Sequence, residues 1–296
     1  MDLFSISELA KYSGIKPHTI RIWEKRYKAL KPNRSLGNTR YYDNSQLRRL
    51  LNITGLLDSD HKVSELCVMP DAKLEAMHWE RRFSPAAESS EYFVSQLIAA
   101  TISYDEVHFV NIFSHCLLRY GMKDTYLKVL YPMLLRIGLM WLNDTLPSAN
   151  EHFASNLIRQ KLFTAIDSLP PPKSTASSWL LFLPQNEFHE IGLLMSYYLI
   201  RLSGRKVIYL GSNVPDSSLK NAVKEIKPEN LLLFFVHQNL TEDTQKYLDH
   251  LNSGLNVKKI YVAANPILTN KLKPGRKINF LGSAQDLDKL LSFIDV

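Results

Sequence analysis

Residues 17–27 read PHTIRIWEKRY, a short cationic segment that opens with a proline. Proline suits the first turn of a helix, because its φ is already helical and its missing N–H would have no partner there. Upstream, Ser5 and Glu8 have the spacing of a capping box, and Ser13-Gly14 ends that first helix after about two turns. Two short helices around a glycine-containing turn predict a helix-turn-helix, whose second helix lies in the major groove of DNA.

The side chains of the second helix, residues 18–27, and of Ile15 just before it divide into two groups. Ile15, Ile20 and Trp23 can face a core. The polar side chains then remain for bases or phosphates, and they are His18, Thr19, Arg21, Glu24 and Lys25.

A hairpin and a third helix are expected next. Residues 31–42 read KPNRSLGNTRYY, in which Gly37-Asn38 is a turn signal between two short extended arms. The hairpin would form a wing that carries Arg34 and Arg40. Asp43 is then placed to cap a helix of aliphatic residues. Together these elements predict a winged helix-turn-helix.

The net charge of the chain is concentrated in the same stretch. Residues 11–50 hold eleven Lys and Arg against two acids, Glu24 and Asp43, so this stretch carries +9 and the rest of the chain sums to −2, for a total of +7. A solvated basic face usually mixes in comparable acid. The asymmetry is typical of a phosphate-binding module attached to a near-neutral body, which makes double-stranded DNA the expected partner.

These residues resemble a known family in both order and spacing. Thr19–Tyr27, Asn33-Arg34 and Thr39–Tyr42 resemble the DNA-binding domain of the MerR family over about the first seventy residues. The resemblance implies a DNA-contacting set, with the helix residues toward the groove and the others on phosphates: His18, Thr19, Arg21, Lys25, Tyr27, Arg34, Arg40 and Tyr41. Tyr41 or Tyr42 can instead pack against the core.

The MerR family usually dimerises through a long coiled-coil helix after this domain. Here Pro70 and Pro85 interrupt the region, and no heptad run survives. We therefore expect a linker at residues 71–87 and a homo-oligomer that assembles through residues beyond Glu88. We also expect residues 1–69 to bind DNA on their own.

The rest of the chain changes pattern twice. Residues 88–170 show helical periodicity in four blocks, which predicts a helical bundle. After Pro170-Pro171-Pro172, strands alternate with helices over residues 175–296, which predicts a Rossmann-like parallel sheet. The expected fold class is multidomain, α and α/β, with the winged helix-turn-helix in residues 1–70, a central four-helix bundle and a C-terminal parallel sheet.

The loop after the first strand of that sheet contains Glu187, His189 and Gly192. Ligands bind at the carboxyl ends of strands in open parallel sheets, and Glu187 could orient His189 as a metal ligand. Glu-x-His-x-x-Gly resembles the cobalamin-binding domain of corrinoid-dependent proteins, which implies that His189 ligates the cobalt from below. Trp141, followed by Glu151-His152, resembles the signature of the bundle that caps the corrinoid. In this order the three regions resemble the light- and cobalamin-responsive repressors of carotenoid genes.

The sequence departs from that family at three places. The family has a serine near the end of the third strand, where the nucleotide tail of the cofactor passes, and this chain has Phe234-Phe235. The next strand ends in Ala263-Ala264 instead of Gly-Gly, so two methyl groups narrow the same slot. Leu142 stands where light-sensing members carry a second histidine. Cobalamin is thus a possible cofactor at a partly degenerate site, or there is none.

Three functions remain open. The leading one is a sequence-specific transcriptional regulator whose C-terminal region senses a corrinoid or drives oligomerisation. The second is a cofactor-free regulator that uses that region for protein interaction, and the third is a corrinoid carrier for a methyltransferase. The basic N-terminal segment argues against the carrier.

Other classes of protein are disfavoured by what the sequence lacks. No catalytic triad, Walker loop, carboxylate pair or zinc spacing indicates an enzyme. Two cysteines, no signal peptide and only short apolar runs favour a reduced, cytoplasmic protein that does not enter a membrane.

Overall fold

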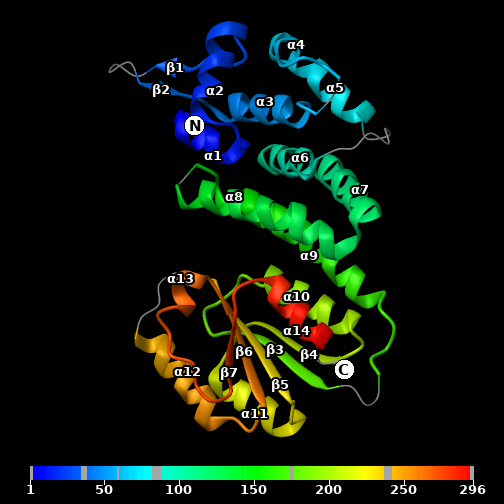
Figure 1. Ribbon diagram of the computed structural model, residues 1–296, viewed down its shortest axis with the longest axis vertical. Helices are drawn as coiled ribbons and strands as arrows, with labels where there is room; N and C mark the ends of the chain where they lie inside the picture. The colour runs from blue at the N-terminus through cyan, green and yellow to red at the C-terminus, as the bar shows by residue number, and fades with distance from the viewer. Residues whose placement is uncertain are drawn as a thin grey trace. The chain divides into compact units, whose positions relative to one another are not determined.

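The computed structural model describes residues 3–34, 39–58, 60–81, 89–143, 145–173, 177–236 and 242–293. The chain forms two compact units, Met1–Leu157 and Ile158–Val296, and the division falls inside helix α9 (Ser148–Asp167). The winged helix-turn-helix and most of the bundle belong to the first unit, and the sheet belongs to the second (Figure 1). The expected domain boundaries near residues 82–88 and 174–176 lie outside the described residues.

The predicted helix-turn-helix is present. Helix α1 (Ile6–Ser13) begins with the Ser5–Glu8 capping box and ends at Gly14, whose φ of +74° is one that glycine adopts without strain. Helix α2 (Pro17–Ile22) runs directly into a π-helical turn, η1 (Trp23–Tyr27). The expected second helix therefore reaches Tyr27, but its winding changes at Trp23.

The predicted wing and third helix are also confirmed. Strands β1 (Asn33–Arg34) and β2 (Arg40–Tyr41) pair antiparallel, and this hairpin extends away from the helices of its unit (Figure 1). Its turn, at Gly37-Asn38, lies outside the described residues. Asp43 caps helix α3 (Asn44–Gly55) by accepting the N–H of Gln46 at 3.0 Å.

The linker expected at residues 71–87 begins with a helix over residues 71–81. Helix α4 (Val63–Val68) is followed by helix α5 (Asp71–Arg81), in which Leu74 and His78 are buried. Arg49 of α3 holds both helices. Its guanidinium donates to three backbone carbonyl oxygens at 2.7–2.9 Å and pairs with one carboxylate, and these partners belong to Ala29, Cys67, Met69 and Asp71.

The four helical blocks of the bundle are observed. They are α6 (Ser90–Ser103), α7 (Glu106–Thr125), α8 (Tyr131–Leu142) and α9, with a π-helical turn, η2 (Tyr126–Leu130), between α7 and α8. Gly121 has a φ of +71° and breaks the helical geometry inside α7. α6 packs on α3, so the bundle begins against the DNA-binding helices.

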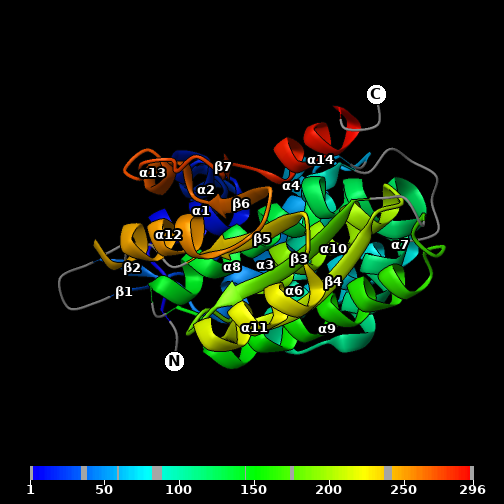
Figure 2. The ribbon, with the colours of Figure 1, turned by 90° about the horizontal axis from the view of Figure 1, so that it is seen from below.

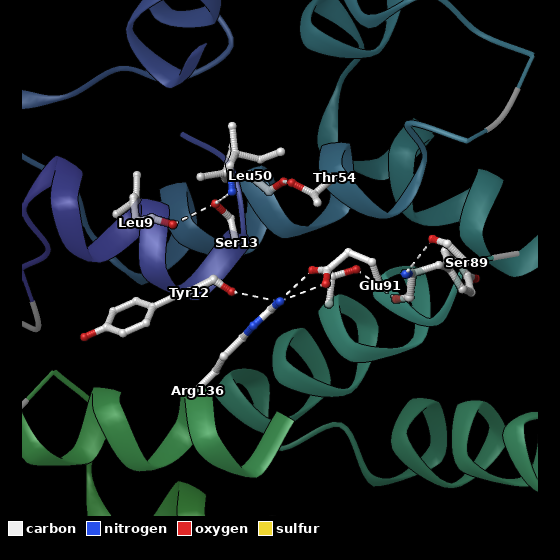
Figure 3. Close-up of polar contacts among 11 residues, drawn as sticks. Leu9, Tyr12, Ser13, Leu50, Thr54, Ser89, Glu91 and Arg136 are labelled. Carbon is white, nitrogen blue, oxygen red and sulfur yellow. Dashed lines mark hydrogen bonds and ion pairs between the residues drawn. The ribbon is translucent and has the colours of Figure 1, made fainter. Parts of the chain in front are cut away.

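Helix α1 is bound to the bundle by polar contacts at its end. Arg136 of α8 pairs with both carboxylate oxygens of Glu91 at 2.6 and 2.8 Å and also donates to the Tyr12 carbonyl oxygen at 3.4 Å (Figure 3). The Tyr12 hydroxyl, fully buried, lies 2.9 Å from the Thr145 hydroxyl and accepts from the Asn143 amide at 3.3 Å. These five residues form what we call the α1 clamp.

The second unit contains the predicted parallel sheet. Its five strands lie in the order β4-β3-β5-β6-β7 and follow one another across the sheet in Figure 2; they are β3 (Ser178–Pro184), β4 (Lys206–Val214), β5 (Asn230–Phe235), β6 (Lys259–Ala264) and β7 (Ile278–Leu281). All neighbours in this order pair parallel.

Helices cover both faces of this sheet, as expected. On one face lie α10 (Ile191–Leu202) and α14 (Ala284–Phe293), and on the other lie α11 (Asp216–Ile226) and α12 (Glu242–Gly254) (Figure 1). A short helix, α13 (Pro266–Thr269), precedes β7. The chain reverses its direction across the sheet at β3, so the loop after β3 lies at the switch point where such sheets bind ligands.

Candidate functional sites

The recognition helix presents its polar side chains to solvent. His18, Arg21 and Lys25 are exposed, and Thr19 is half-buried, with its hydroxyl 3.4 Å from the His18 ring. On the opposite face Ile20 is completely buried. The structure thus matches the expected division at Ile20, Trp23, His18, Arg21 and Lys25, while Ile15 is only half-buried and Glu24 is turned toward the wing.

The last turn of the recognition helix has π-helical geometry. The N–H groups of Lys28 and Ala29 both reach back to the Trp23 carbonyl oxygen, and Lys28 ends the turn with a φ of +56°. Trp23 is 7% exposed and anchors this turn in the core. π-Turns of this kind occur often at functional sites. Tyr27, expected to contact phosphate, is half-buried here with Arg26 over its ring.

The wing is bonded to the recognition helix through an acid. Glu24 accepts the Nε–H of Arg40 at 3.0 Å on one carboxylate oxygen and the Tyr42 hydroxyl at 2.8 Å on the other. Burial, and then the hydrogen bond to Glu24, raise the pKa of Tyr42, so this hydroxyl remains a donor at neutral pH. Sequence reasoning had placed Glu24 among the residues available to DNA, and it missed this role.

The expected phosphate-contacting residues of the wing have different surroundings. Arg34 is exposed and Tyr41 is half-buried, while the alternative of a packed tyrosine applies to Tyr42, which is completely buried. Arg40 is 38% exposed and already paired with Glu24. Arg49, which counted toward the basic stretch, is occupied by the contacts that fix α4 and α5.

A second candidate site lies in the loop after β3. The His189 Nδ1–H donates to Glu187 at 2.7 Å, which leaves Nε2 as the nitrogen that would coordinate a metal. Glu187 is 6% exposed and also accepts backbone N–H groups from Phe188, His189 and Val236. Burial alone would raise the pKa of Glu187, but the His189 bond and these N–H groups together lower the pKa to about 2. His189 is thus held by a carboxylate that stays ionised.

The space beside this loop is filled by an aromatic ring. A Cβ atom added to Gly192 would lie 2.8 Å from the Phe234 ring, so this ring rests directly on the Gly192 backbone. Phe234 pairs with Ala263 across the strands β5 and β6, and Phe235 pairs with Ala264. The departures on β5 and β6 are therefore neighbours in space, and the Phe234 ring lies against the first turn of α10 at Gly192.

The remaining expected residues lie in the first unit. Trp141 is 43% exposed at the end of α8, and Leu142 beside it is 64% exposed. The Glu151 carboxylate accepts from Ser155 and lies 2.8 Å from the exposed His152 ring. These side chains point out of the bundle rather than into its core.

Two family models match the chain. Residues 4–67 match the MerR HTH family regulatory protein, and residues 93–165 match the B12 binding domain. Two curated relatives come from Myxococcus xanthus. The HTH-type transcriptional repressor CarH is 27% identical over 85% of each chain, and the repressor CarA is 28% identical over 82% of this chain and 80% of its own. The chain therefore combines a MerR HTH domain with a B12-binding domain, and it is homologous to these two repressors.

A solved structure matches the same regulator at the level of fold. The monomethylamine corrinoid protein of Methanosarcina barkeri superposes with a TM-score of 0.53 at 15% identity, covering 70% of this regulator and all of that protein. The fold of the matched part is therefore shared with that protein.

The described part of the regulator contains neither a candidate membrane span nor a candidate metal cluster. No helix in it is long and apolar enough to cross a membrane. The same residues contain no group of three or more His, Cys, Asp or Glu that could hold a metal ion.

Proposed function

We propose that this regulator binds an operator with α2, η1 and the wing, and that it does so as a dimer or larger assembly formed through residues beyond Glu88. The observation that carries the proposal is the exposed cationic surface of Arg21, Lys25 and Arg34 on an intact winged helix-turn-helix. Two copies related by a two-fold axis would read symmetric half-sites.

The assembly and its operator can be tested together with the full-length chain. Selection from random duplexes should yield inverted half-sites, and sedimentation at micromolar concentration should give a species of at least twice 34.0 kDa. A monomer that protects a single unrepeated half-site would contradict the proposal. The half-site spacing would then also have no geometric origin.

The fit of cobalamin to the second unit is incomplete. His189, held by Glu187, has the donor and the orientation that a lower cobalt ligand needs, and the family uses such an imidazole. The nucleotide tail does not fit, because the Phe234 ring occupies the space against Gly192 and two alanine methyl groups line the neighbouring strand end. We therefore propose that this region works in assembly without cobalamin.

One observation favours a second candidate, a corrinoid that lacks the tail. The imidazole and its carboxylate are intact while only the tail space is filled. Absorption spectra of the full-length protein should distinguish the cases: no change with hydroxocobalamin at about 100 μM supports the first proposal. A shift with cobinamide alone supports the second candidate, and a shift with hydroxocobalamin contradicts both.

The carrier function has less support. A corrinoid carrier has no use for an exposed recognition helix, and the curated relatives that cover most of this chain are regulators by name. We propose that the chain has no enzymatic activity.

A further inference from the structure

We propose that Glu24 is a positioning residue for DNA binding, which holds the wing in register with the recognition helix. It lies on the same helical segment as Arg21 and Lys25, within the surface that faces a polyanion. An exposed carboxylate there would only repel phosphate. The structure gives it another use, because both of its oxygens are bonded to the wing.

The geometry of the contact supports a positioning role. The Glu24 side chain is 12% exposed, and its two bonds go to Arg40 and Tyr42, which lie at and just beyond β2. Tyr42 is itself tied to the first unit, since its backbone bridges to Phe4 on both sides at 2.7 and 2.9 Å. Glu24 therefore joins the recognition helix to Tyr42, the residue after β2, which the core already anchors.

The bond from Arg40 to Glu24 also orients the Arg40 guanidinium, whose charge Glu24 neutralises in part. Glu24 engages the Nε–H of Arg40, and a guanidinium that is bonded through Nε can still offer its two terminal amino groups to a phosphate as a fork. Without Glu24, Arg40 would have to lose the freedom of a long side chain upon binding. The acid thus favours binding indirectly, through the arginine.

This proposal predicts the sign of a mutational effect. If Glu24 acts only by its charge, Glu24→Ala and Glu24→Gln should both strengthen binding to every DNA sequence. If Glu24 positions the wing, Glu24→Ala should weaken operator binding by about tenfold, the size of one charge-assisted hydrogen bond. Glu24→Gln should keep most of the affinity, because the amide oxygen can still accept from Arg40 while the amide nitrogen faces the Tyr42 hydroxyl.

A double-mutant cycle with Arg40 gives a second readout in the full-length protein. Arg40→Ala should flatten the dependence of log affinity on log salt by about 0.9, the contribution of one phosphate contact. Glu24→Ala should flatten it equally, and the double variant should lose nothing more. Asp60→Asn, which removes an exposed acid elsewhere in the same unit, is the charge control and should leave the slope unchanged.

Stronger binding by Glu24→Ala, or additive losses in the double variant, would overturn the proposal. Thermal unfolding of each variant checks that the unit is intact. Should Glu24→Ala fail to fold, Tyr42→Phe removes one of the two bonds and keeps the buried ring. It should weaken operator binding without changing the salt slope, and an unchanged affinity would count against the proposal.

Discussion

The two units each hold a cationic or basic side chain by a carboxylate, and the two pairs have different surroundings. In the DNA-binding part, Glu24 holds Arg40 at the edge of an open, exposed surface that a duplex can reach. In the sheet unit, Glu187 holds His189 at 2.7 Å, but the Phe234 ring lies against Gly192, three residues further along the chain. The Glu24–Arg40 pair therefore borders an open surface, whereas the Glu187–His189 loop borders a packed side chain.

Binding a ligand therefore has two separate requirements, which are a residue that contacts the ligand and a space that the ligand can occupy. A loop such as the one after β3 keeps its bonds through local contacts, here backbone N–H groups to Glu187. The space depends on side chains from β5 and β6, which are distant in sequence. One requirement can therefore persist after the other is lost.

The largest expected effect concerns how far the DNA-binding part is independent. DNA binding by residues 1–69 alone stays a prediction, but α3 packs on α6 and the α1 clamp fixes Tyr12 to the bundle, so this fragment lacks contacts that support its helices. A fragment of residues 1–69 should lose cooperative thermal unfolding, whereas residues 1–157 should keep it. Circular dichroism melts of the two fragments measure this. Equal, cooperative melting of both would show that the bundle is dispensable.

The next effect separates the two kinds of contact on the open surface. Arg34→Ala should weaken binding to all duplexes and flatten the salt slope by about 0.9. Arg21→Ala should instead reduce the preference for operator over random DNA by about 1–3 kcal/mol. Titrations at several salt concentrations, on both kinds of duplex, give both quantities. Identical behaviour of the two variants would mean that the wing and the helix are wrongly assigned.

A third variant should open the space beside the Glu187–His189 loop, so that it resembles the open surroundings of Glu24 and Arg40. Phe234→Ser should open the space against Gly192 and allow weak binding of hydroxocobalamin, seen as a shift in its absorption spectrum, while His189→Ala in the same background should abolish the shift. Adding Ala263→Gly and Ala264→Gly should strengthen the binding further, since both methyl groups then leave the slot. If Phe234→Ser shows no shift even at about 100 μM, the Phe234 ring is not what excludes the cofactor.

The smallest expected effect is on stability. Because the pKa of Glu187 is lowered to about 2, from an ordinary value of about 4.5, its ionised form stabilises the folded unit above pH 4.5. That stabilisation should be lost as the pH falls from about 4.5 toward 2, and Glu187→Gln should remove this part of the acid sensitivity. Melting temperatures between pH 3 and 6 for both proteins measure it. Parallel curves would indicate that another carboxyl group controls the acid response.

Much of the fold was predictable because its signals are local. The Ser5–Glu8 capping box, the Asp43 cap and the alternation of strands with helices after residue 175 depend on neighbours in sequence, and the structure confirms them. Helix α5 was missed because it packs against α3 and its first residue, Asp71, pairs with Arg49, and no local pattern reveals these contacts. The π-turn at Trp23 was missed for a similar reason, since a change of one residue in winding leaves the apolar spacing almost unchanged.

The sites were less predictable than the fold. The pairing of Glu187 with His189 followed from their spacing, because two residues apart in one loop can meet. The pairing of Glu24 with Arg40 did not, since it needs the register between a helix and a hairpin. The position of Phe234 over Gly192 needs the packing of α10 on β5.

The α1 clamp has a consequence for how such regulators can be recombined. Its members are spread over residues 12 to 145, and each bond requires a partner from another segment. A crossover placed after the wing would take residue 12 from one parent protein and the bundle from another. The bundle residues that contact residue 12 would then come from a different sequence. The exchangeable module is therefore the whole first unit, and a chimera that keeps residues 12, 91, 136, 143 and 145 from one parent should inherit a DNA specificity without rebuilding its support.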